Sequence, residues 1–140
     1  MEVESVIPIL RIFDLAKVKE FYVGFLGFKI DWEHTFEPGM PVYMQVSRGD
    51  KLVLHLTEHH GDCCPGSTVF IRFRKGLEEF HKEITSKGYK HLRPGIEVME
   101  WGQKSLEVID PFGNKLRFCE KIEAAAEGQA GAAAMEPMEK

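Results

Sequence analysis

Hydrophobic and polar positions follow one order along the first half of the chain. Val6–Ile12 is a β-branched, apolar run that predicts a strand. After Asp14, a good helix N-cap, apolar residues recur at helical spacing until Gly27, at Leu15, Val18, Phe21, Tyr22, Phe25 and Leu26. Turn residues then separate three strand-like runs, at Phe28–Trp32, Val42–Ser47 and Leu52–Thr57.

The same order begins again in the second half. Thr68–Phe73 predicts a strand, and a second amphipathic helix follows and is closed by Gly88, with its apolar positions at Leu77, Phe80 and Ile84. Three further strands are expected at about Lys90–Arg93, Ser105–Ile109 and Lys115–Cys119. Because neither half could bury a sheet face alone, we predict an α+β fold. Two βαβββ modules would form a curved mixed sheet whose inner face forms a cleft.

Length and composition predict one domain and a tail. The chain has 140 residues, and its last 18 are rich in Ala, Gly and Glu, so we expect a folded domain over residues 1–122 and a disordered tail over 123–140. No apolar run approaches the ~20 residues that span a bilayer, and the N-terminus lacks a basic segment. We therefore expect a cytoplasmic protein.

Charge and cysteine content exclude some functions. A net charge of -4 disfavours nucleic acid and is mildly permissive for a cationic ligand. The three cysteines are an odd number, and a bridge between the adjacent Cys63 and Cys64 would be strained. We expect these two and Cys119 to be free thiols.

Two short motifs carry a family resemblance. Leu26-Gly27-Phe28 follows the first helix, and the turn Asp110-Pro111-Phe112-Gly113-Asn114 precedes the last strand. With the order of elements, they resemble the vicinal oxygen chelate superfamily, which includes glyoxalase I, extradiol dioxygenases, fosfomycin resistance enzymes and bleomycin resistance proteins. The likeness covers about residues 5–121. It is closer to the bleomycin resistance proteins, through Ile7-Pro8-Ile9, Trp101-Gly102 and Leu116-Arg117-Phe118.

The resemblance also indicates where a metal would bind. Enzymes of the superfamily use His, Gln or Glu from the first and last strands of each half. Here those positions fall at about Ile7, at His55, at Thr68 or Val69, and at Arg117. Only His55 can be a ligand, and the permanent cation of Arg117 would repel a divalent ion. We therefore expect neither a metal nor another cofactor.

An enzymatic alternative stays open. The segment Glu58-His59-His60-Gly61-Asp62-Cys63-Cys64 follows His55 and is rich in metal donors. It would allow a metal-dependent, glyoxalase- or dioxygenase-like lyase or isomerase with a nonstandard site near His55. We favour a polar, exposed loop, because its spacing matches no zinc motif. A family member with an unrelated ligand is a further possibility.

Without a metal, a cleft would bind through shape, stacking and charge. Flat aromatic faces stack on heteroaromatic ligands and attract cations. The mixed aromatic and acidic segment from Asp31 to Phe36 suits a bulky, cationic, aromatic drug. The candidate ligand-binding residues are Trp32, Phe36, Tyr43, His55, Trp101 and Arg117. The alternative for the aromatic residues is a place in the core or an interface.

The resemblance also implies an assembly and a function. Bleomycin resistance proteins are homodimers that exchange N-terminal strands, and Pro8 matches the proline associated with that exchange. Proline in an edge strand without exchange is the alternative. We predict a metal-independent homodimer that confers antibiotic resistance by sequestering a bleomycin-like small molecule, not an enzyme that turns it over.

Overall fold

The computed structural model describes residues 1–122, which form two compact units. The first unit comprises residues 1–69 and 109–115, and the second comprises 70–108 and 116–122. The predicted tail, 123–140, lies outside the described residues, and the single domain over 1–122 stays a prediction. No helix in residues 1–122 is long and apolar enough to cross a membrane.

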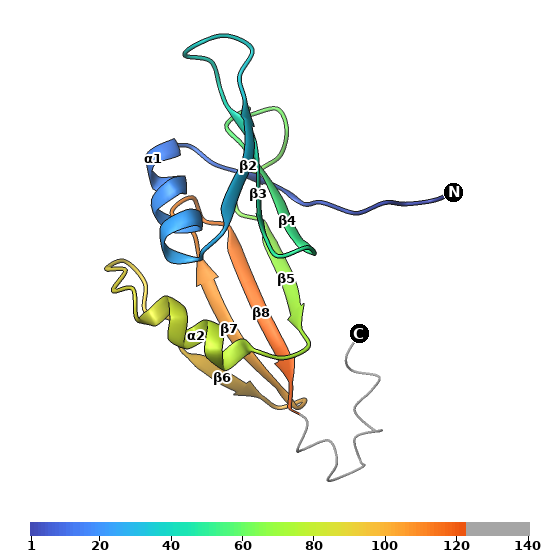
Figure 1. Cartoon of the computed structure of the whole chain (residues 1–140), viewed down its shortest axis with the longest axis vertical. Helices are drawn as coiled ribbons and strands as arrows, with labels where there is room; N and C mark the ends of the chain where they lie inside the picture. The colour runs from blue at the N-terminus through green and yellow to red at the C-terminus, as the bar shows by residue number, and fades with distance from the viewer. Residues whose placement is uncertain (123–140) are drawn as a thin grey trace. The chain divides into compact units, whose positions relative to one another are not determined.

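The first unit is built on a four-stranded mixed sheet in the order β1-β4-β3-β2 (Figure 1). β1 pairs in parallel with β4, and the other neighbours pair antiparallel. The strands are β1 (Ile9–Arg11), β2 (Lys29–His34), β3 (Tyr43–Arg48) and β4 (Leu52–Thr57). β1 is shorter than the predicted run Val6–Ile12, whereas the other three follow the predicted runs closely.

The helix of this unit changes geometry part way along. Its first turn, α1 (Leu15–Val18), is capped as predicted, because the Asp14 carboxylate accepts a hydrogen bond from the Lys17 amide at 3.2 Å. It continues as the π-helical segment η1 (Lys19–Phe25), in which the Leu26 amide donates to the Phe21 carbonyl, five residues earlier, at 2.9 Å. The left-handed Gly27 (φ 80°) ends the helix, which confirms its predicted role.

Strand alternation separates the two faces of this sheet. Met44 and Val46 of β3, with Leu54 and Leu56 of β4, are fully buried with the apolar side of the helix. Intervening residues such as Tyr43, Gln45 and His55 therefore project from the opposite face.

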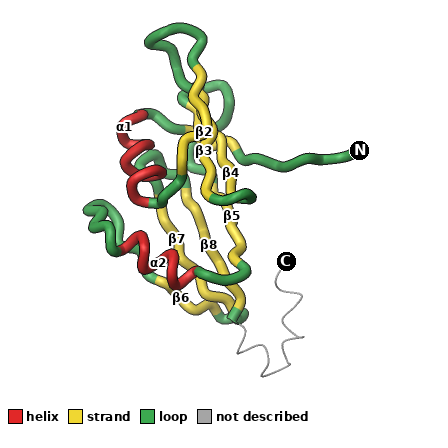
Figure 2. The backbone as a smooth tube through the Cα atoms, in the orientation of Figure 1, coloured by secondary structure: helices red, strands yellow, loops and turns green. Residues whose placement is uncertain are grey.

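The second unit repeats this pattern with the sheet order β5-β8-β7-β6 (Figures 1 and 2). Its elements are β5 (Thr68–Phe73), α2 (Leu77–Thr85), β6 (Ile96–Met99), β7 (Gln103–Ile109) and β8 (Lys115–Lys121). The two four-stranded mixed sheets with few helices confirm the predicted α+β class. Phe73, Phe80 and Phe118 pack ring against ring in the core, with centroids 4.9–5.7 Å apart.

One predicted strand is wrong. Residues 90–93 form an irregular turn, and the chain enters the sheet only at Ile96. This segment has one apolar side chain to bury, Leu92. Pro94 and Gly95 follow directly; Pro94 has no backbone donor for a sheet, and both residues are rare inside strands.

The turn between β7 and β8 is a buried polar cluster. One Asp110 oxygen accepts hydrogen bonds from the amides of Phe112 (2.9 Å) and Asn114 (2.8 Å). The other accepts from the Tyr22 hydroxyl (2.6 Å) and the Asn114 side-chain amide (2.9 Å). That amide also donates to the Arg11 carbonyl at 2.8 Å. The turn is therefore tied to the helix and first strand of the first unit.

This cluster is protected from water. Asn114 and Tyr22 are fully buried, and Asp110 is nearly so. Burial, together with the adjacent Asp110 carboxylate, raises the pKa of Tyr22 well above its ordinary value. The hydroxyl therefore stays protonated and donates to Asp110 at any ordinary pH.

We expect Asp110→Ala to lower the free energy of unfolding by about 3 kcal/mol, because it leaves several buried donors without an acceptor. Tyr22→Phe removes one of these donors and should cost about 1.5 kcal/mol. Urea unfolding followed by circular dichroism measures both. A loss for Asp110→Ala no larger than that for Tyr22→Phe would contradict the role of Asp110 as the common acceptor.

Candidate ligand-binding site

The six predicted site residues fall into two groups, one on each unit. Trp32, Phe36, Tyr43 and His55 belong to the first unit. Trp101 and Arg117 belong to the second. The structure therefore presents two candidate surfaces, which are described separately.

The first surface, here called the aromatic face, consists of Trp32, Tyr43 and His55 on β2, β3 and β4. The Trp32 and Tyr43 rings are nearly parallel, 11° apart with centroids at 6.1 Å. The His55 ring meets both edge-on, at 5.4 Å from Trp32 and 5.1 Å from Tyr43. Because Trp32 keeps 42% of its surface exposed, it offers a flat face to a ligand.

A chain of hydrogen bonds fixes the imidazole of this face. His55 Nδ1 lies 2.8 Å from the Tyr43 hydroxyl, and Nε2 lies 2.9 Å from Gln45 Oε1. The Gln45 amide nitrogen donates to Asp31 at 3.0 Å, so its oxygen is left to accept from His55. Nε2 therefore carries the proton and Nδ1 accepts from Tyr43. Both ring nitrogens are engaged, and neither is free to bind a metal.

Negative charge sits at the far end of this chain. Asp31 also accepts from the Ser47 hydroxyl at 3.1 Å, and the hydrogen bonds from Gln45 and Ser47 lower the pKa of its carboxyl. Burial lowers the pKa of His55 and raises the pKa of Tyr43, so both stay neutral at pH 7. The aromatic face is thus an uncharged aromatic surface with the ionised Asp31 carboxylate, which lies 3.7 Å from Lys29 Nζ, at its edge.

Phe36 lies apart from this face. It sits in the loop between β2 and β3, with 74% of its surface exposed, and its ring contacts His34 at 5.1 Å. The structure therefore does not bring Phe36 together with Trp32, Tyr43 and His55.

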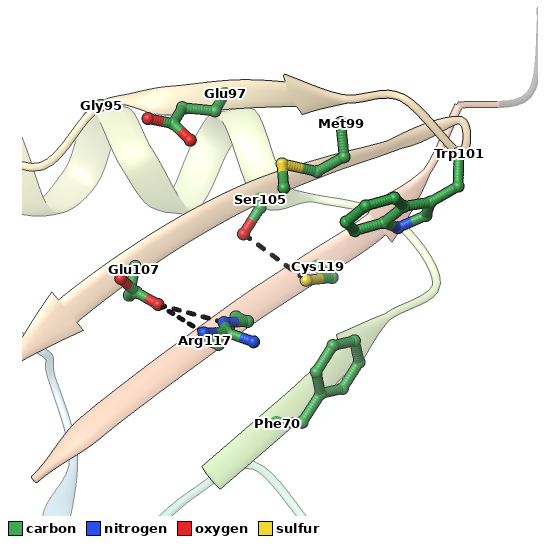
Figure 3. A pocket seen from close by; sticks show the side chains of 9 residues that line it. All are labelled: Phe70, Gly95, Glu97, Met99, Trp101, Ser105, Glu107, Arg117 and Cys119. Atoms are coloured by element: carbon green, nitrogen blue, oxygen red, sulfur yellow. Dashed lines mark hydrogen bonds and ion pairs between the residues drawn. The ribbon is translucent and has the colours of Figure 1, made fainter. Parts of the chain in front are cut away.

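The second surface is a pocket in the second unit, here called the β6–β8 pocket (Figure 3). It has a volume of about 470 Å³. Trp101 lines the pocket, and 44% of its surface is exposed. Phe70 of β5, Met99 and Cys119 also line the pocket. The complete lining is Phe70, Gly95, Glu97, Met99, Trp101, Ser105, Glu107, Arg117 and Cys119. Trp101 and Arg117, predicted separately, therefore share one pocket.

Arg117 is paired with a carboxylate inside this pocket. Its Nε donates to Glu107 Oε2 at 3.0 Å, and its Nη2 lies 3.0 Å from the same oxygen. Both side chains remain partly exposed. At this position, where the resemblance implies a metal ligand, the Arg117 cation is thus balanced by a neighbour on β7 (Figure 3).

Sequence reasoning missed most of the pocket lining. Glu107 and Ser105 alternate along β7 with the fully buried Leu106 and Val108, which is the signal of a strand with one face in the core and one face open. Applied to the whole of β7, this alternation would have predicted that the Glu107 side chain lies on the open face, which lines the pocket. Phe70 alternates in the same way on β5.

Among residues 1–122, no group of three or more His, Cys, Asp or Glu side chains could hold a metal ion. On β1 the residue that pairs with His55 is Ile9, whose side chain cannot bind a metal. The loop after His55 folds on itself, because the Thr57 hydroxyl donates to Asp62 at 2.7 Å and accepts from the His59 amide. Cys63, Cys64 and Cys119 are free, as predicted.

Comparison with known proteins agrees with this architecture. A family model described as glyoxalase superfamily protein matches residues 1–125. A bleomycin resistance protein from Geobacillus stearothermophilus is 25% identical over 135 residues, which cover 84% of this chain and 97% of that protein. The chain therefore belongs to the glyoxalase superfamily.

Solved structures give the same result. A bleomycin-binding protein complexed with bleomycin is 28% identical, with a TM-score of 0.62, over 85% of this chain and 99% of that chain. A bleomycin resistance determinant encoded on the transposon Tn5 is 26% identical, with a TM-score of 0.64, over 85% and 98%. A glyoxalase-related enzyme from Clostridium phytofermentans reaches a TM-score of 0.71 at 21% identity, over 87% and 98%, and shares the fold.

The state of His55 predicts a pH dependence of stability. Its pKa is lowered in the folded protein, so below its ordinary value of about 6.5 the unfolded chain binds more protons than the folded chain. The free energy of unfolding should therefore fall as pH drops below about 6.5, and His55→Gln should reduce this fall.

Urea unfolding from about pH 7.5 to about pH 5 measures the effect. The exposed His60 serves as the matched control, and His60→Gln should follow the wild-type curve. A His55→Gln curve that coincides with the wild-type curve would show that His55 titrates as in the unfolded chain.

Proposed function

We propose that this protein is a metal-independent binder of a bulky, flat, cationic small molecule of the bleomycin type. It would protect by stoichiometric sequestration, without turnover. The observation that carries the proposal is the β6–β8 pocket, a cavity of about 470 Å³ with Trp101 and Phe70 in its lining and more negative than positive charge. A pocket of this size suits a ligand fragment of drug size.

Charge in the pocket supports a cationic ligand. Glu97 and Glu107 face a single cation, Arg117, which leaves one net negative charge. Arg117 is already paired with Glu107, whereas Glu97 makes no hydrogen bond or ion pair with the residues of the described chain. Glu97 is therefore available to bind a positive group on a ligand.

The relatives support the class of ligand. Proteins named for bleomycin resistance, and one solved with bleomycin bound, match nearly the whole chain at 25–28% identity. The aromatic face adds a second exposed stacking surface, at Trp32. Stacking of aromatic rings and attraction of cations by their faces are the interactions that such a ligand would use.

Two contacts support metal independence. The ring nitrogens of His55 are held by Tyr43 and Gln45, so a metal would have to displace one of these hydrogen bonds. Arg117 occupies the second position at which the resemblance implies a ligand, and its cation is engaged with Glu107. Neither position is arranged for a divalent ion.

We also propose a cytoplasmic homodimer whose N-terminal residues, around Pro8, contact the partner subunit. Residues 1–8 run as an extended chain before β1 (Figure 1), and the apolar Val3 and Val6 of this segment are largely exposed. A second subunit would cover these apolar side chains, and a symmetric dimer is the commonest assembly that could do so.

Metal-free bleomycin should bind saturably, with a dissociation constant in the micromolar range or below, in isothermal titration calorimetry with EDTA present. Trp101→Ala should weaken binding by about tenfold, because it removes an aromatic stacking surface. Val98→Ala is the matched control, since Val98 is an exposed apolar residue of β6 outside the pocket lining. No saturable binding below millimolar bleomycin would refute the drug-specific proposal, and binding that requires an added metal would refute metal independence.

The homodimer should sediment at twice the chain mass of 16.0 kDa in analytical ultracentrifugation. Deleting residues 2–7 should shift the protein toward the monomer, because it removes Val3 and Val6 but keeps Pro8, whose carbonyl accepts from the His55 amide at 3.0 Å. A full-length chain that sediments at the mass of one subunit would exclude the dimer.

A further inference from the structure

Four side chains of the aromatic face form a hydrogen-bond relay that runs in one direction. The ionised Asp31 carboxylate can only accept, so Gln45 must offer it the amide nitrogen and keep its oxygen for His55. The neutral His55 donates its one ring proton from Nε2 to that oxygen, and its Nδ1 accepts from the Tyr43 hydroxyl at 2.8 Å. Donation therefore runs from Tyr43 to Asp31, and the carboxylate sets its direction.

This direction leaves one acceptor of the relay unused. The single proton of the Tyr43 hydroxyl is donated to His55, whereas its oxygen still has a lone pair that can accept. Among residues 1–122, no group donates a hydrogen bond to this oxygen. Because each hydrogen bond of a relay polarises the next, the carboxylate at the far end makes the Tyr43 oxygen a stronger acceptor. The Tyr43 side chain is only half-buried, so part of it remains open to a ligand.

We propose that the aromatic face binds a flat aromatic ligand that carries a hydrogen-bond donor, an N–H or O–H group, on its edge, and that Tyr43 selects this donor. The inference deepens the proposed function and rests on it, because it states what a small molecule must present at this second stacking surface. The ring of the ligand lies on the exposed face of Trp32. Its edge donor points to the Tyr43 oxygen.

The orientation of the rings favours this arrangement. The Trp32 and Tyr43 rings are 11° from parallel, so a flat ligand on Trp32 is nearly parallel to the Tyr43 ring as well. The phenol oxygen lies in the plane of its own ring, and an edge N–H lies in the plane of the ligand. The donor and the acceptor can therefore meet edge to edge while the ring of the ligand stacks.

An acceptor on the edge of the ligand fits this position less well. It would meet the lone pair of the Tyr43 oxygen, or it would have to take the hydroxyl proton away from His55. In the second case Nδ1 of His55 loses its donor, and a polar group that loses its partner on binding lowers the affinity. A ligand with an edge donor gains one hydrogen bond without breaking any bond of the relay.

Three probes of similar size test the inference: indole, which has an edge N–H, and benzofuran and 1-methylindole, which have none. NMR titrations of the full chain give their dissociation constants from the shift of the Trp32 indole N–H. The chain has two tryptophans, and Trp101 reports on the β6–β8 pocket in the same spectra. At Trp32 we expect indole to bind about fivefold more tightly than either other probe, which is the ratio that one hydrogen bond supplies.

Two variants test the relay itself. Tyr43→Phe keeps the ring and removes the oxygen, so the preference for indole should disappear. Asp31→Asn gives Gln45 a partner that can donate as well as accept, so the relay is no longer held in one direction and the preference should fall to about twofold or less. Asp50→Asn is the matched control, because Asp50 is an exposed acid in the turn between β3 and β4, and it should keep the full preference. Circular dichroism melts establish that each variant is folded.

The outcomes separate this inference from the proposed function. Nitrogen-15 shifts of the His55 ring should show the proton on Nε2, and a proton on Nδ1 overturns the inference. It is also overturned if no probe shifts Trp32, if the three probes bind there equally, or if folded Tyr43→Phe or Asp31→Asn keeps the full preference. If any of these occurs but bleomycin binds and shifts Trp101, the proposed function stands. If neither the probes nor bleomycin shift either tryptophan, both are overturned.

Discussion

The buried hydrogen bonds of Asp110 are the constraint on which the first unit depends. One carboxylate collects the Tyr22 hydroxyl and the side-chain amide of Asn114, and Asn114 in turn holds the backbone of Arg11. The helix and the first strand are therefore both joined to the turn, through Asp110 and Asn114. Because a buried polar group without a partner is costly in this position, the turn admits few alternative conformations.

Much of the fold could be predicted because the local signals agree with the tertiary structure. The alternation over Leu52–Thr57 and Thr68–Phe73, the Asp14 cap and Gly27 each specify an element by themselves. The strand predicted at residues 90–93 was wrong because a segment with a single apolar side chain fits a strand or a turn equally. The following proline, which has no backbone donor, favours the turn. The π-helical turn at Lys19–Phe25 has no distinct apolar period, so the sequence could indicate only a helix.

The sequence named individual residues of the candidate site but not the partners with which they interact. Trp32, Tyr43 and His55 lie together and Trp101 shares a pocket with Arg117, yet Phe36 lies apart. Pairing depends on strand register and side-chain direction, which composition does not carry. Two residues that were not predicted show this: Gln45 fixes the tautomer of His55 by a hydrogen bond, and Glu107 balances the charge of Arg117.

The alternation of β8 has a consequence for how binding preference can change. Arg117 lies between the fully buried Leu116 and Phe118, so a residue proposed to line a ligand site and residues of the core are neighbours that point in opposite directions. The same separation holds at Glu107, between Leu106 and Val108. A single replacement at either charged position would leave the core side chains untouched. The proposed ligand preference could therefore change along a short mutational path, with little loss of stability at each step.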